Sequence, residues 1–375
     1  MVRLFYLGYN VGRAHHPTAI SKLAATRRNG EPPLTTSPKK PSGAVSESNS
    51  PVTQTRESPE VPGSAGFPGS IEDIQNLLRD QVYITDRALA VPIFLAMKLR
   101  RPLFLEGEAG VGKTEIARAL AQGLGTELIR LQCYEGLDIN HAVYEWNHPR
   151  QLLEIRLMEV GGNVDRASAT ANLFSEEFLI KRPLLQAIDQ SNERSPVLLI
   201  DELDRADEEF EGFLLELLAD FQITIPELGT FSAANPPIVI ITSNRTREVH
   251  DALKRRCLYY WIEYPDYQKE LQIITSRLPE APRRLAEQVT GFIQELRETE
   301  LYKIPGISET LDWTSALLAL NQKELGPEVI DDTLGLMLKY QDDIELVRGE
   351  PVRAMLERSK NRGPRRGRRG GGNAG

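Results

Sequence analysis

The stretch that decides the fold is PLFLEGEAGVGKTEIARALAQGLG, residues 102–125. Its first five residues form a short apolar run typical of a buried strand, and residues 113–124 place apolar side chains on one stripe of a helix. Between them lies a glycine-rich turn of the form G-x-x-x-x-G-K-T. A strand, this turn and a helix in that order predict a loop that binds phosphate.

The residues of this turn suit a nucleoside triphosphate. Glycines let backbone N–H groups face the phosphates, and the start of the helix adds partial positive charge. Lys113 is expected to reach the β and γ phosphates, and the Thr114 hydroxyl to bind Mg²⁺. We therefore expect ATP with Mg²⁺ to bind at Gly107, Glu108, Ala109, Gly110, Val111, Gly112, Lys113, Thr114 and Glu115.

Hydrolysis needs further groups, and two later segments offer them. In VLLIDELDRAD, residues 197–207, four apolar residues run directly into Asp201 and Glu202. A carboxylate at the tip of such a strand can hold Mg²⁺, the Walker B role expected of Asp201, and Glu202 beside it can polarise the attacking water. The alternative is that Asp201 only caps the following helix. Asn244 ends the next apolar run, VIITSN, where its amide is expected to orient the water, although Asn also occurs in simple turns.

Two arginines follow in DALKRRC, residues 251–257, at the end of a short predicted helix. Arg255 and Arg256 lie far along the chain from their own phosphate loop. An arginine that stabilises transferred phosphoryl charge can come from a neighbouring subunit. The segment therefore favours a homo-oligomeric ring with Arg255 and Arg256 as candidates for that residue.

The wider pattern predicts an α/β fold. Short apolar runs with little alternation alternate with amphipathic helices, as in a doubly wound parallel sheet. The strand candidates are residues 102–106, 127–133, 196–201, 237–243 and 259–264. The expected domains are a disordered extension and linker at 1–69, a P-loop core at 70–265, a small all-helical lid at 266–357 and a disordered Arg/Gly-rich tail at 358–375.

Charge and cysteine usage narrow the class of protein. The net charge is −8, yet residues 1–65 and 358–369 are basic, so the middle is strongly acidic and nucleic acid is an unlikely partner. The chain has two cysteines, Cys133 and Cys257, and no apolar run near the ~20 residues of a membrane helix. These features favour the cytoplasm and exclude a disulfide framework. Cys133, His141 and His148 match no zinc-binding spacing.

The order of these motifs resembles AAA+ ATPases over about residues 70–320. Longer phrases, such as FLEGEAGVGKTEIA and ITSNRTREVHDALKRRC, are similar to the MoxR branch, and most of all to the subgroup that accompanies carbon monoxide dehydrogenase and related molybdenum hydroxylases. The resemblance implies a hexameric, chaperone-like ATPase that matures or activates a metalloenzyme beside a partner with a von Willebrand factor A domain. It assigns Asn244 as sensor 1 and favours Arg256 over Arg255 as the trans-acting arginine.

The resemblance also implies features that this chain meets only in part. Many relatives carry an arginine, called sensor 2, near the start of a lid helix, where this chain reads GISETLDW with Thr310 nearest that position. Two substrate-facing insertions are implied, one within Tyr134–Pro183 and a β-hairpin at FQITIPELGTFS, residues 221–232. Tyr144, Trp146, His148 and Arg150 in the first could grip a client or pack a local minicore.

Three functions remain open at this point. A protein-remodelling ATPase fits the acidic middle best. A nucleic-acid-stimulated motor would use the basic tail, and a nucleotide-gated scaffold with little hydrolysis would fit the missing arginine at Thr310.

Overall fold

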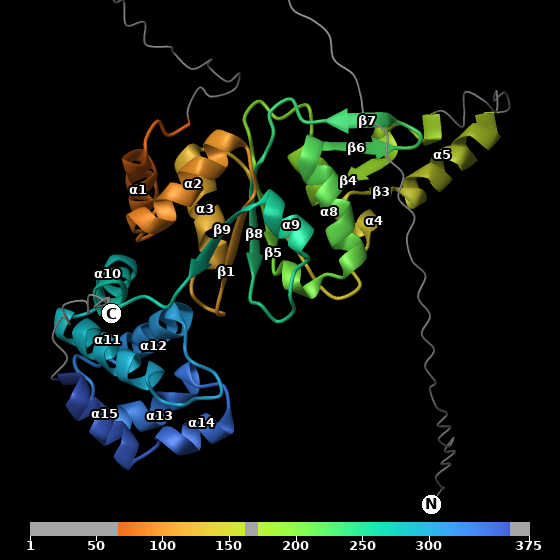
Figure 1. The fold of residues 1–375 in the computed structure, drawn as a ribbon. Helices are drawn as coiled ribbons and strands as arrows, with labels where there is room; N and C mark the ends of the chain where they lie inside the picture. Colours follow the sequence, from red (N-terminus) through yellow and green to blue (C-terminus); the bar gives the residue numbers. More distant parts are fainter. Residues whose placement is uncertain (1–66, 162–171, 361–375) are drawn as a thin grey trace, which may run out of the picture. The chain divides into compact units, whose positions relative to one another are not determined.

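The computed structural model describes residues 67–161 and 172–360, and its centre is one five-stranded sheet (Figure 1). The strands are β1 (Leu103–Gly107), β2 (Leu128–Gln132), β5 (Val197–Asp201), β8 (Ile238–Ser243) and β9 (Leu258–Ile262). Their order is β2-β5-β8-β1-β9, and every neighbouring pair is parallel. All five strand candidates and the α/β class are confirmed, with strand ends that differ by one or two residues.

Helices bury both faces of this sheet, which explains why its strands read as continuous apolar runs. One face, with Leu103 and Leu105 of β1, packs against α1 (Ile71–Asp80), α2 (Arg87–Leu99) and α3 (Lys113–Leu124). The other face, with Phe104 of β1, packs against α7 (Pro183–Ala187), α8 (Glu208–Asp220) and α9 (Asp251–Arg256). Because α3 begins directly after the turn that follows β1, the turn is fixed at the carboxyl end of the sheet.

Local sequence fixes where these helices begin. Asp207 caps α8 by accepting a hydrogen bond from the Phe210 N–H, and three glutamates in the first turn favour the same end of the helix. Ser70 and Asp73 form a capping box at α1. By contrast α3 follows Gly112, which has φ +93° and no side chain to cap the helix. The first N–H groups of α3 are therefore left to a ligand.

Two small antiparallel sheets extend this core. Before β5 the chain forms α4 (Ile139–Ala142), β3 (Tyr144–Trp146), α5 (His148–Gly161), η1 (Glu176–Phe178) and β4 (Leu179–Lys181), and β3 pairs with β4. The Trp146 ring packs edge-on against Phe174 with centroids 5.2 Å apart, so this aromatic group forms a local minicore. After η2 (Leu203–Arg205) and α8, the expected hairpin forms from β6 (Gln222–Ile225) and β7 (Gly229–Ser232).

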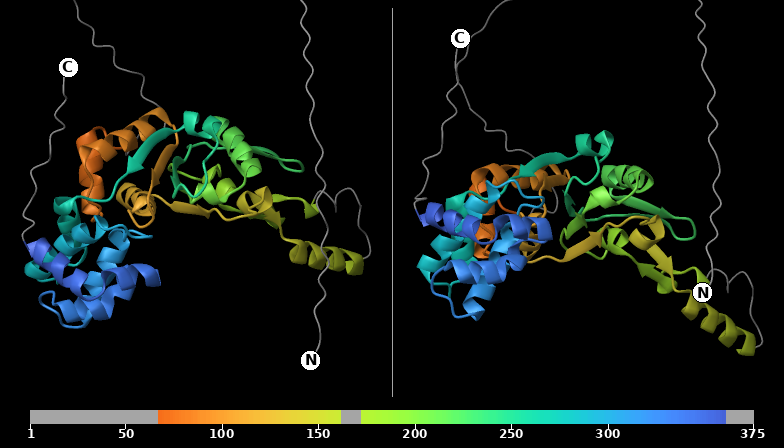
Figure 2. Two further views of the ribbon diagram at one scale, coloured as in Figure 1. Left: turned by 60° about the horizontal axis from the view of Figure 1, so that its bottom comes forward. Right: turned by 90° about the horizontal axis from the view of Figure 1, so that it is seen from below.

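The C-terminal helices have their own core. They are α10 (Tyr267–Arg277), α11 (Arg283–Arg297), α12 (Ile307–Ala319), α13 (Pro327–Met337), α14 (Gln341–Val347) and α15 (Glu350–Lys360), gathered into one bundle in Figure 2. Trp313 is fully buried at its centre, with the Phe292 ring 5.6 Å away. The part of the chain that follows the sheet is therefore helical, with a core of its own.

The boundary of the expected tail needs correction. Helix α15 continues through residues 358–360, because Arg358 pairs with Glu295 at 2.7 Å and Ser359 packs against Gly291. The other residues of the tail, and the extension up to residue 66, lie outside the described part of the chain.

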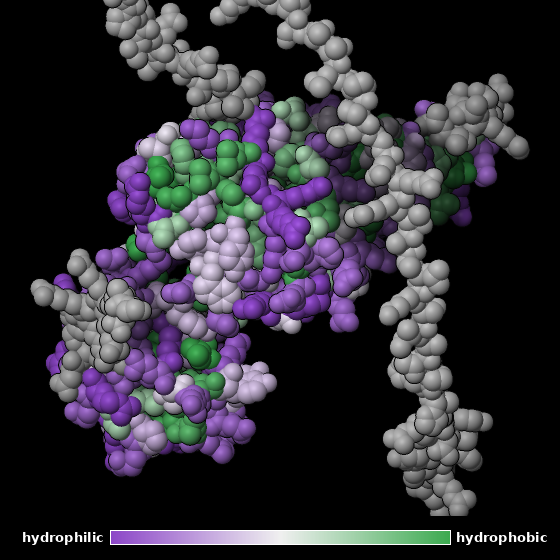
Figure 3. All heavy atoms as spheres, in the orientation of Figure 1, coloured by the Kyte–Doolittle hydropathy of each residue, from purple (hydrophilic) through white to green (hydrophobic). Residues whose placement is uncertain are grey.

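Apolar side chains are exposed on two helices of the described surface: Leu95 and Leu99 of α2 are 37% and 54% exposed, and Leu152, Leu153 and Leu157 of α5 are 61%, 59% and 59% exposed. Apolar atoms are gathered over α2 in Figure 3. None of the helices within residues 67–161 and 172–360 is long and apolar enough to cross a membrane.

Candidate nucleotide site

The phosphate loop between β1 and α3 takes its shape from glycines at special positions. A Cβ on Gly107 would lie 2.4 Å from the Ile262 carbonyl oxygen of β9, so no larger residue fits there without a shift. Gly110 and Gly112 have φ values of +78° and +93°, a region that L side chains rarely adopt. The loop is thus held in one curved conformation by its own sequence and by its neighbour strand.

Lys113 lies inside this curve. Its Nζ donates to the carbonyl oxygens of Gly107 and Glu108, at 2.7 Å each, and the side chain is almost fully buried. Burial lowers the pKa of Lys113, while the nearby carboxylates of Asp204, Glu108, Asp201 and Glu202 act in the opposite direction. The ammonium is therefore kept in place by surrounding negative charge.

Asp201 is the centre of the polar contacts at the end of β5. Its Oδ1 accepts hydrogen bonds from the hydroxyls of Thr114, at 2.9 Å, and Thr242, at 2.6 Å. Its Oδ2 accepts from the Nε of Arg130 at 3.0 Å. Only 3% of the Asp201 side chain is exposed, which strengthens each of these interactions.

The oxygen atoms here fit a hard divalent cation. Mg²⁺ takes oxygen ligands and is usually held by one or two protein groups together with phosphates and waters. The structure brings a hydroxyl and a carboxylate, Thr114 and Asp201, to hydrogen-bonding distance beside the phosphate loop. Within residues 67–161 and 172–360 there is no cluster of three His, Cys, Asp or Glu that could hold a metal, so Cys133, His141 and His148 do not form one.

Glu202 adopts an unusual backbone conformation for a residue with a side chain. Its φ is +56°, its N–H donates to the Thr242 hydroxyl at 2.9 Å, and its carboxylate pairs with Arg205 at 3.0 Å. Such strained positions cost on the order of 1–3 kcal/mol and tend to cluster at functional sites. The turn directs the chain away from β5 immediately after Asp201.

Asn244 lies at the end of the neighbouring strand β8. Its N–H donates to Asp204 Oδ1 at 3.2 Å, and Asp204 Oδ2 accepts from the N–H and hydroxyl of Thr246. Asp204 therefore fixes the turn that holds Asn244 at the edge of the sheet where β5 ends at Asp201.

Hydrogen bonds from Arg101 and to α8 fix the two arginines at the end of α9. The guanidinium of Arg101 donates to the carbonyl oxygens of Arg255, Arg256 and Cys257 at 2.8, 3.0 and 3.3 Å. The Arg256 guanidinium donates to the Leu215 carbonyl oxygen in α8. Within the described chain no hydrogen bond or ion pair joins Arg255 or Arg256 to the phosphate loop, and their action across subunits stays a prediction.

Thr310 does not face the phosphate loop. It is fully buried within the lid and its hydroxyl donates to Glu270 Oε1 at 2.9 Å. Instead, Gly306 and Ser308 of the same segment contact the loop, and the Ser308 N–H donates to the Gly110 carbonyl oxygen at 3.2 Å.

A cavity of about 280 Å³ lies beside the loop. Its lining comes from residues before the sheet, from α3 and from the lid: Val82, Tyr83, Gly112, Glu115, Lys269 and Arg277 are among the residues that line it. Arg277 of α10 also pairs with Glu115 at 2.7 Å. The cavity is concave and mostly apolar with a few polar groups, which is the character of a small-molecule site.

Three residues at this site were not predicted from the sequence. Arg130 lies two residues before Gln132, which is in register with Asp201, so alternation along β2 places Arg130 on the same face. Thr242 lies two residues before Asn244, and Asp204 lies within the acidic run after β5. Alternation along β2 and β8 indicates on which face of its strand each of the first two lies, but not that these strands flank β5.

Residues 102–257 match the family model described as AAA domain, dynein-related subfamily. These residues form an AAA+ ATPase domain. AAA+ domains generally assemble into oligomers. They bind and hydrolyse nucleotide, and the matched range contains a phosphate loop, a carboxylate pair and a polar strand end that suit this chemistry.

The AAA+ domain and its flanks are similar to other proteins. Lon protease of Lawsonia intracellularis (strain PHE/MN1-00) is 25% identical over 238 residues, covering 59% of this chain and 24% of that protein. The RuvB Holliday junction branch migration motor of Thermotoga maritima shares 18% identity at a TM-score of 0.37 and covers 72% of each chain. A Cytophaga hutchinsonii protein named as a candidate ATPase shares 16% identity at a TM-score of 0.38, covering 78% of this chain and 93% of that one.

Proposed function

We propose that the chain binds ATP with Mg²⁺ and hydrolyses it to ADP and phosphate, with residues 70–265 as the ATPase core and 266–360 as the lid. The observation that carries this proposal is the contact between Thr114 and the buried Asp201, next to Lys113 inside the phosphate loop. The proposal is supported by the position of one lysine and of two side-chain oxygens, from Thr114 and Asp201, at the same edge of the sheet.

Each residue has a distinct role in the proposal. Residues 107–115 hold the phosphates, mainly through backbone N–H groups and Lys113, and Thr114 and Asp201 would hold Mg²⁺, Asp201 through water. Bound Mg²⁺ would neutralise phosphate charge and orient the γ-phosphate. Glu202 accepts the proton of the attacking water, and Asn244 orients that water without adding charge.

Two contacts of Glu202 support its proposed role as the group that accepts the proton of the attacking water. Its carboxylate is paired with Arg205 three residues along the chain, a contact that is partly exposed and therefore weak. Turning the side chain toward the phosphates requires loss of that single ion pair, while Thr242 keeps the backbone of Glu202 in place.

We further propose that the chain acts as a chaperone-like remodeller in a homo-oligomeric ring, with six copies as its MoxR resemblance implies. Arg256, with Arg255 as the alternative, would reach the neighbour's nucleotide, since α9 ends in both residues and Arg101 fixes its end. The exposed apolar side chains of α2 offer one surface that assembly could cover. The cytoplasm is the proposed location, because Cys133 and Cys257 are both free thiols.

The proposed client is a metalloenzyme such as a molybdenum hydroxylase, with a von Willebrand factor A protein as partner. This part rests on the resemblance of the long phrases to the MoxR subgroup. The hairpin β6–β7 and the β3–β4 insertion are the surfaces that we propose to face the client. A nucleic-acid-stimulated motor is disfavoured by the acidic middle of the chain, whereas a scaffold with little hydrolysis is favoured by the buried position of Thr310.

The experiment is phosphate release by the wild type and by Glu202→Gln, with Glu208→Gln as control. Glu208 lies in the first turn of α8 on the surface, so its change alters charge equally without touching the site. We expect Glu202→Gln to lose at least ~100-fold in turnover, as for removal of a general base, while Glu208→Gln stays at the wild-type rate. Equal rates in all three proteins would refute the role of Glu202, and a wild type with negligible turnover would favour the scaffold. DNA or RNA that raises turnover at about 200 mM salt would favour the motor.

A further inference from the structure

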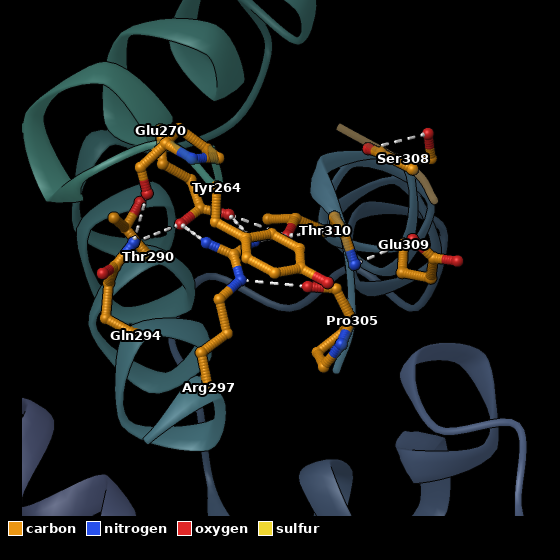
Figure 4. Close-up of polar contacts among 12 residues, drawn as sticks. Tyr264, Glu270, Thr290, Gln294, Arg297, Pro305, Ser308, Glu309 and Thr310 are labelled. Carbon is orange, nitrogen blue, oxygen red and sulfur yellow. Dashed lines mark hydrogen bonds and ion pairs between the residues drawn. The ribbon is translucent and has the colours of Figure 1, made fainter. Parts of the chain in front are cut away.

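The lid contains a buried ion pair with an unusual number of partners (Figure 4). Arg297 of α11 donates to both carboxylate oxygens of Glu270 in α10, at 2.7 and 2.8 Å, and the exposed fractions of the two side chains are 8% and 0%. Gln294 and Thr310 donate to the same carboxylate at 2.7 and 2.9 Å. All four oxygen lone-pair positions of Glu270 are thus engaged, which fixes the geometry of the helices that supply the donors.

The same pair holds the segment that follows α11. The Nε of Arg297 donates to the Pro305 carbonyl oxygen at 2.9 Å, and Thr310 anchors the first turn of α12 to Glu270. The Tyr264 ring lies 5.0 Å from the guanidinium and comes from the connection between β9 and α10. Residues 305–310 are therefore clamped at both ends to one buried charge pair.

The clamped segment meets the phosphate loop backbone to backbone. A Cβ on Gly306 would lie 2.8 Å from the Cα, carbonyl carbon and oxygen of Gly110. The Ser308 N–H donates to the Gly110 carbonyl oxygen at 3.2 Å, and its hydroxyl lies 3.4 Å from the same oxygen. Gly306 has φ −84°, so a glycine is required here by the close approach and not by the backbone conformation.

We propose that Gly306 and Ser308 are the element by which the lid holds the phosphate loop in the conformation that binds ATP, and that the Glu270–Arg297 pair positions this element. The proposal rests on the proposed nucleotide binding. A loop whose Gly110 peptide is held by the lid keeps the curvature that phosphates need. The lid thus contacts the phosphate loop through the backbone of Gly306 and Ser308, whereas the side chain of Thr310 is buried against Glu270.

The first test is Gly306→Ala, with Gly335→Ala as control. The new methyl group at residue 306 must push Gly110 away, because its neighbours are backbone atoms that cannot rotate aside. At Gly335, in the exposed face of α13, a Cβ meets nothing within 4 Å. We measure the affinity for a fluorescent ATP analogue with Mg²⁺, phosphate release, and the thermal midpoint of each full-length protein.

For Gly306→Ala we expect at least tenfold weaker analogue binding and a raised KM for ATP, measured well below the thermal midpoint of the variant so that the protein is folded. Gly335→Ala should bind like the wild type. Affinity within twofold of wild type in Gly306→Ala would overturn the proposal. A wild type that binds no nucleotide would refute the proposed function itself, whereas unchanged binding in Gly306→Ala refutes only the role of this contact.

A second test separates positioning from simple stability. Arg297→Lys keeps a charge for Glu270 but loses the Nε donor to the Pro305 carbonyl oxygen, whereas Arg283→Lys makes the same change at an exposed arginine of α11. We expect Arg297→Lys to raise KM for ATP more than it lowers kcat, and Arg283→Lys to change neither by more than twofold. Equal KM values in Arg297→Lys and the wild type would contradict the positioning role of the pair.

Discussion

The buried ion pair of the lid leads to a stability prediction with a defined size. Arg297→Met removes the cation and leaves the fully buried Glu270 carboxylate with only Gln294 and Thr310 as donors. Removing one partner of a buried pair costs about 3–5 kcal/mol because the remaining charge is uncompensated. This cost applies here because the side chains of Arg297 and Glu270 are only 8% and 0% exposed.

The double variant Glu270→Leu/Arg297→Met supplies the comparison. The double variant buries no unpaired charge. We therefore expect its free energy of unfolding to be about 2 kcal/mol higher than that of Arg297→Met alone. A surface pair offers the control: Arg283 and Glu287 in α11 contact at 2.9 Å with 85% and 42% exposure, and Arg283→Met should cost less than about 1 kcal/mol.

Trp313 provides the assay, since it is fully buried in the lid core next to Phe292. Replacing Trp146 and Trp261 by Phe leaves Trp313 as the single tryptophan of a chain that has three. Its fluorescence during urea unfolding reports the lid directly. An Arg297→Met lid that unfolds within about 1 kcal/mol of the parent, or a double variant that is the least stable of the set, would refute this account of the pair.

Three further predictions concern the core. An Arg256→Ala chain mixed with a Lys113→Ala chain should regain ATP turnover through mixed rings, and no rescue at any mixing ratio, with mixing shown by native mass spectrometry, would count against action across subunits. Arg130→Met should strengthen Mg²⁺ binding in the presence of ATP by roughly a factor of three or more, since a cation beside Asp201 opposes a second one, and an unchanged Mg²⁺ titration would contradict this. Burial raises the pKa of Cys133 and of Cys257 to about 12 from an ordinary 9.0, so both thiols stay protonated at pH 8 and should react with a thiol reagent roughly a thousandfold more slowly than in urea; fast labelling of the folded protein would show that they are accessible.

The strands of the sheet could be predicted because each is an uninterrupted apolar run, and the phosphate loop because glycines and a lysine at fixed spacing follow one of these runs. The side chains that meet across neighbouring strands could not be predicted, because their contacts depend on the order of the strands in the sheet. Arg130 and Thr242 come to Asp201 from neighbouring strands, and a linear reading does not show which strands are neighbours.

The lid was less predictable than the sheet. Its helical periodicity was visible, but the Glu270–Arg297 pair joins helices through side chains whose burial no local pattern indicates. The end of α15 was missed for a related reason: Arg358 and Lys360 suggested the start of a solvated basic tail, while Arg358 contacts Glu295 and Ser359 packs against Gly291.

The central claim is that residues 107–115 hold ATP with Mg²⁺, and calorimetric titration tests it most directly. Mg²⁺·ATP should bind to the wild type with one site per chain, and Lys113→Ala should abolish or greatly weaken the heat of binding, because it removes the buried cation inside the loop. A wild type that gives no binding heat with ample Mg²⁺, or a Lys113→Ala chain that binds as tightly as the wild type, would contradict the account.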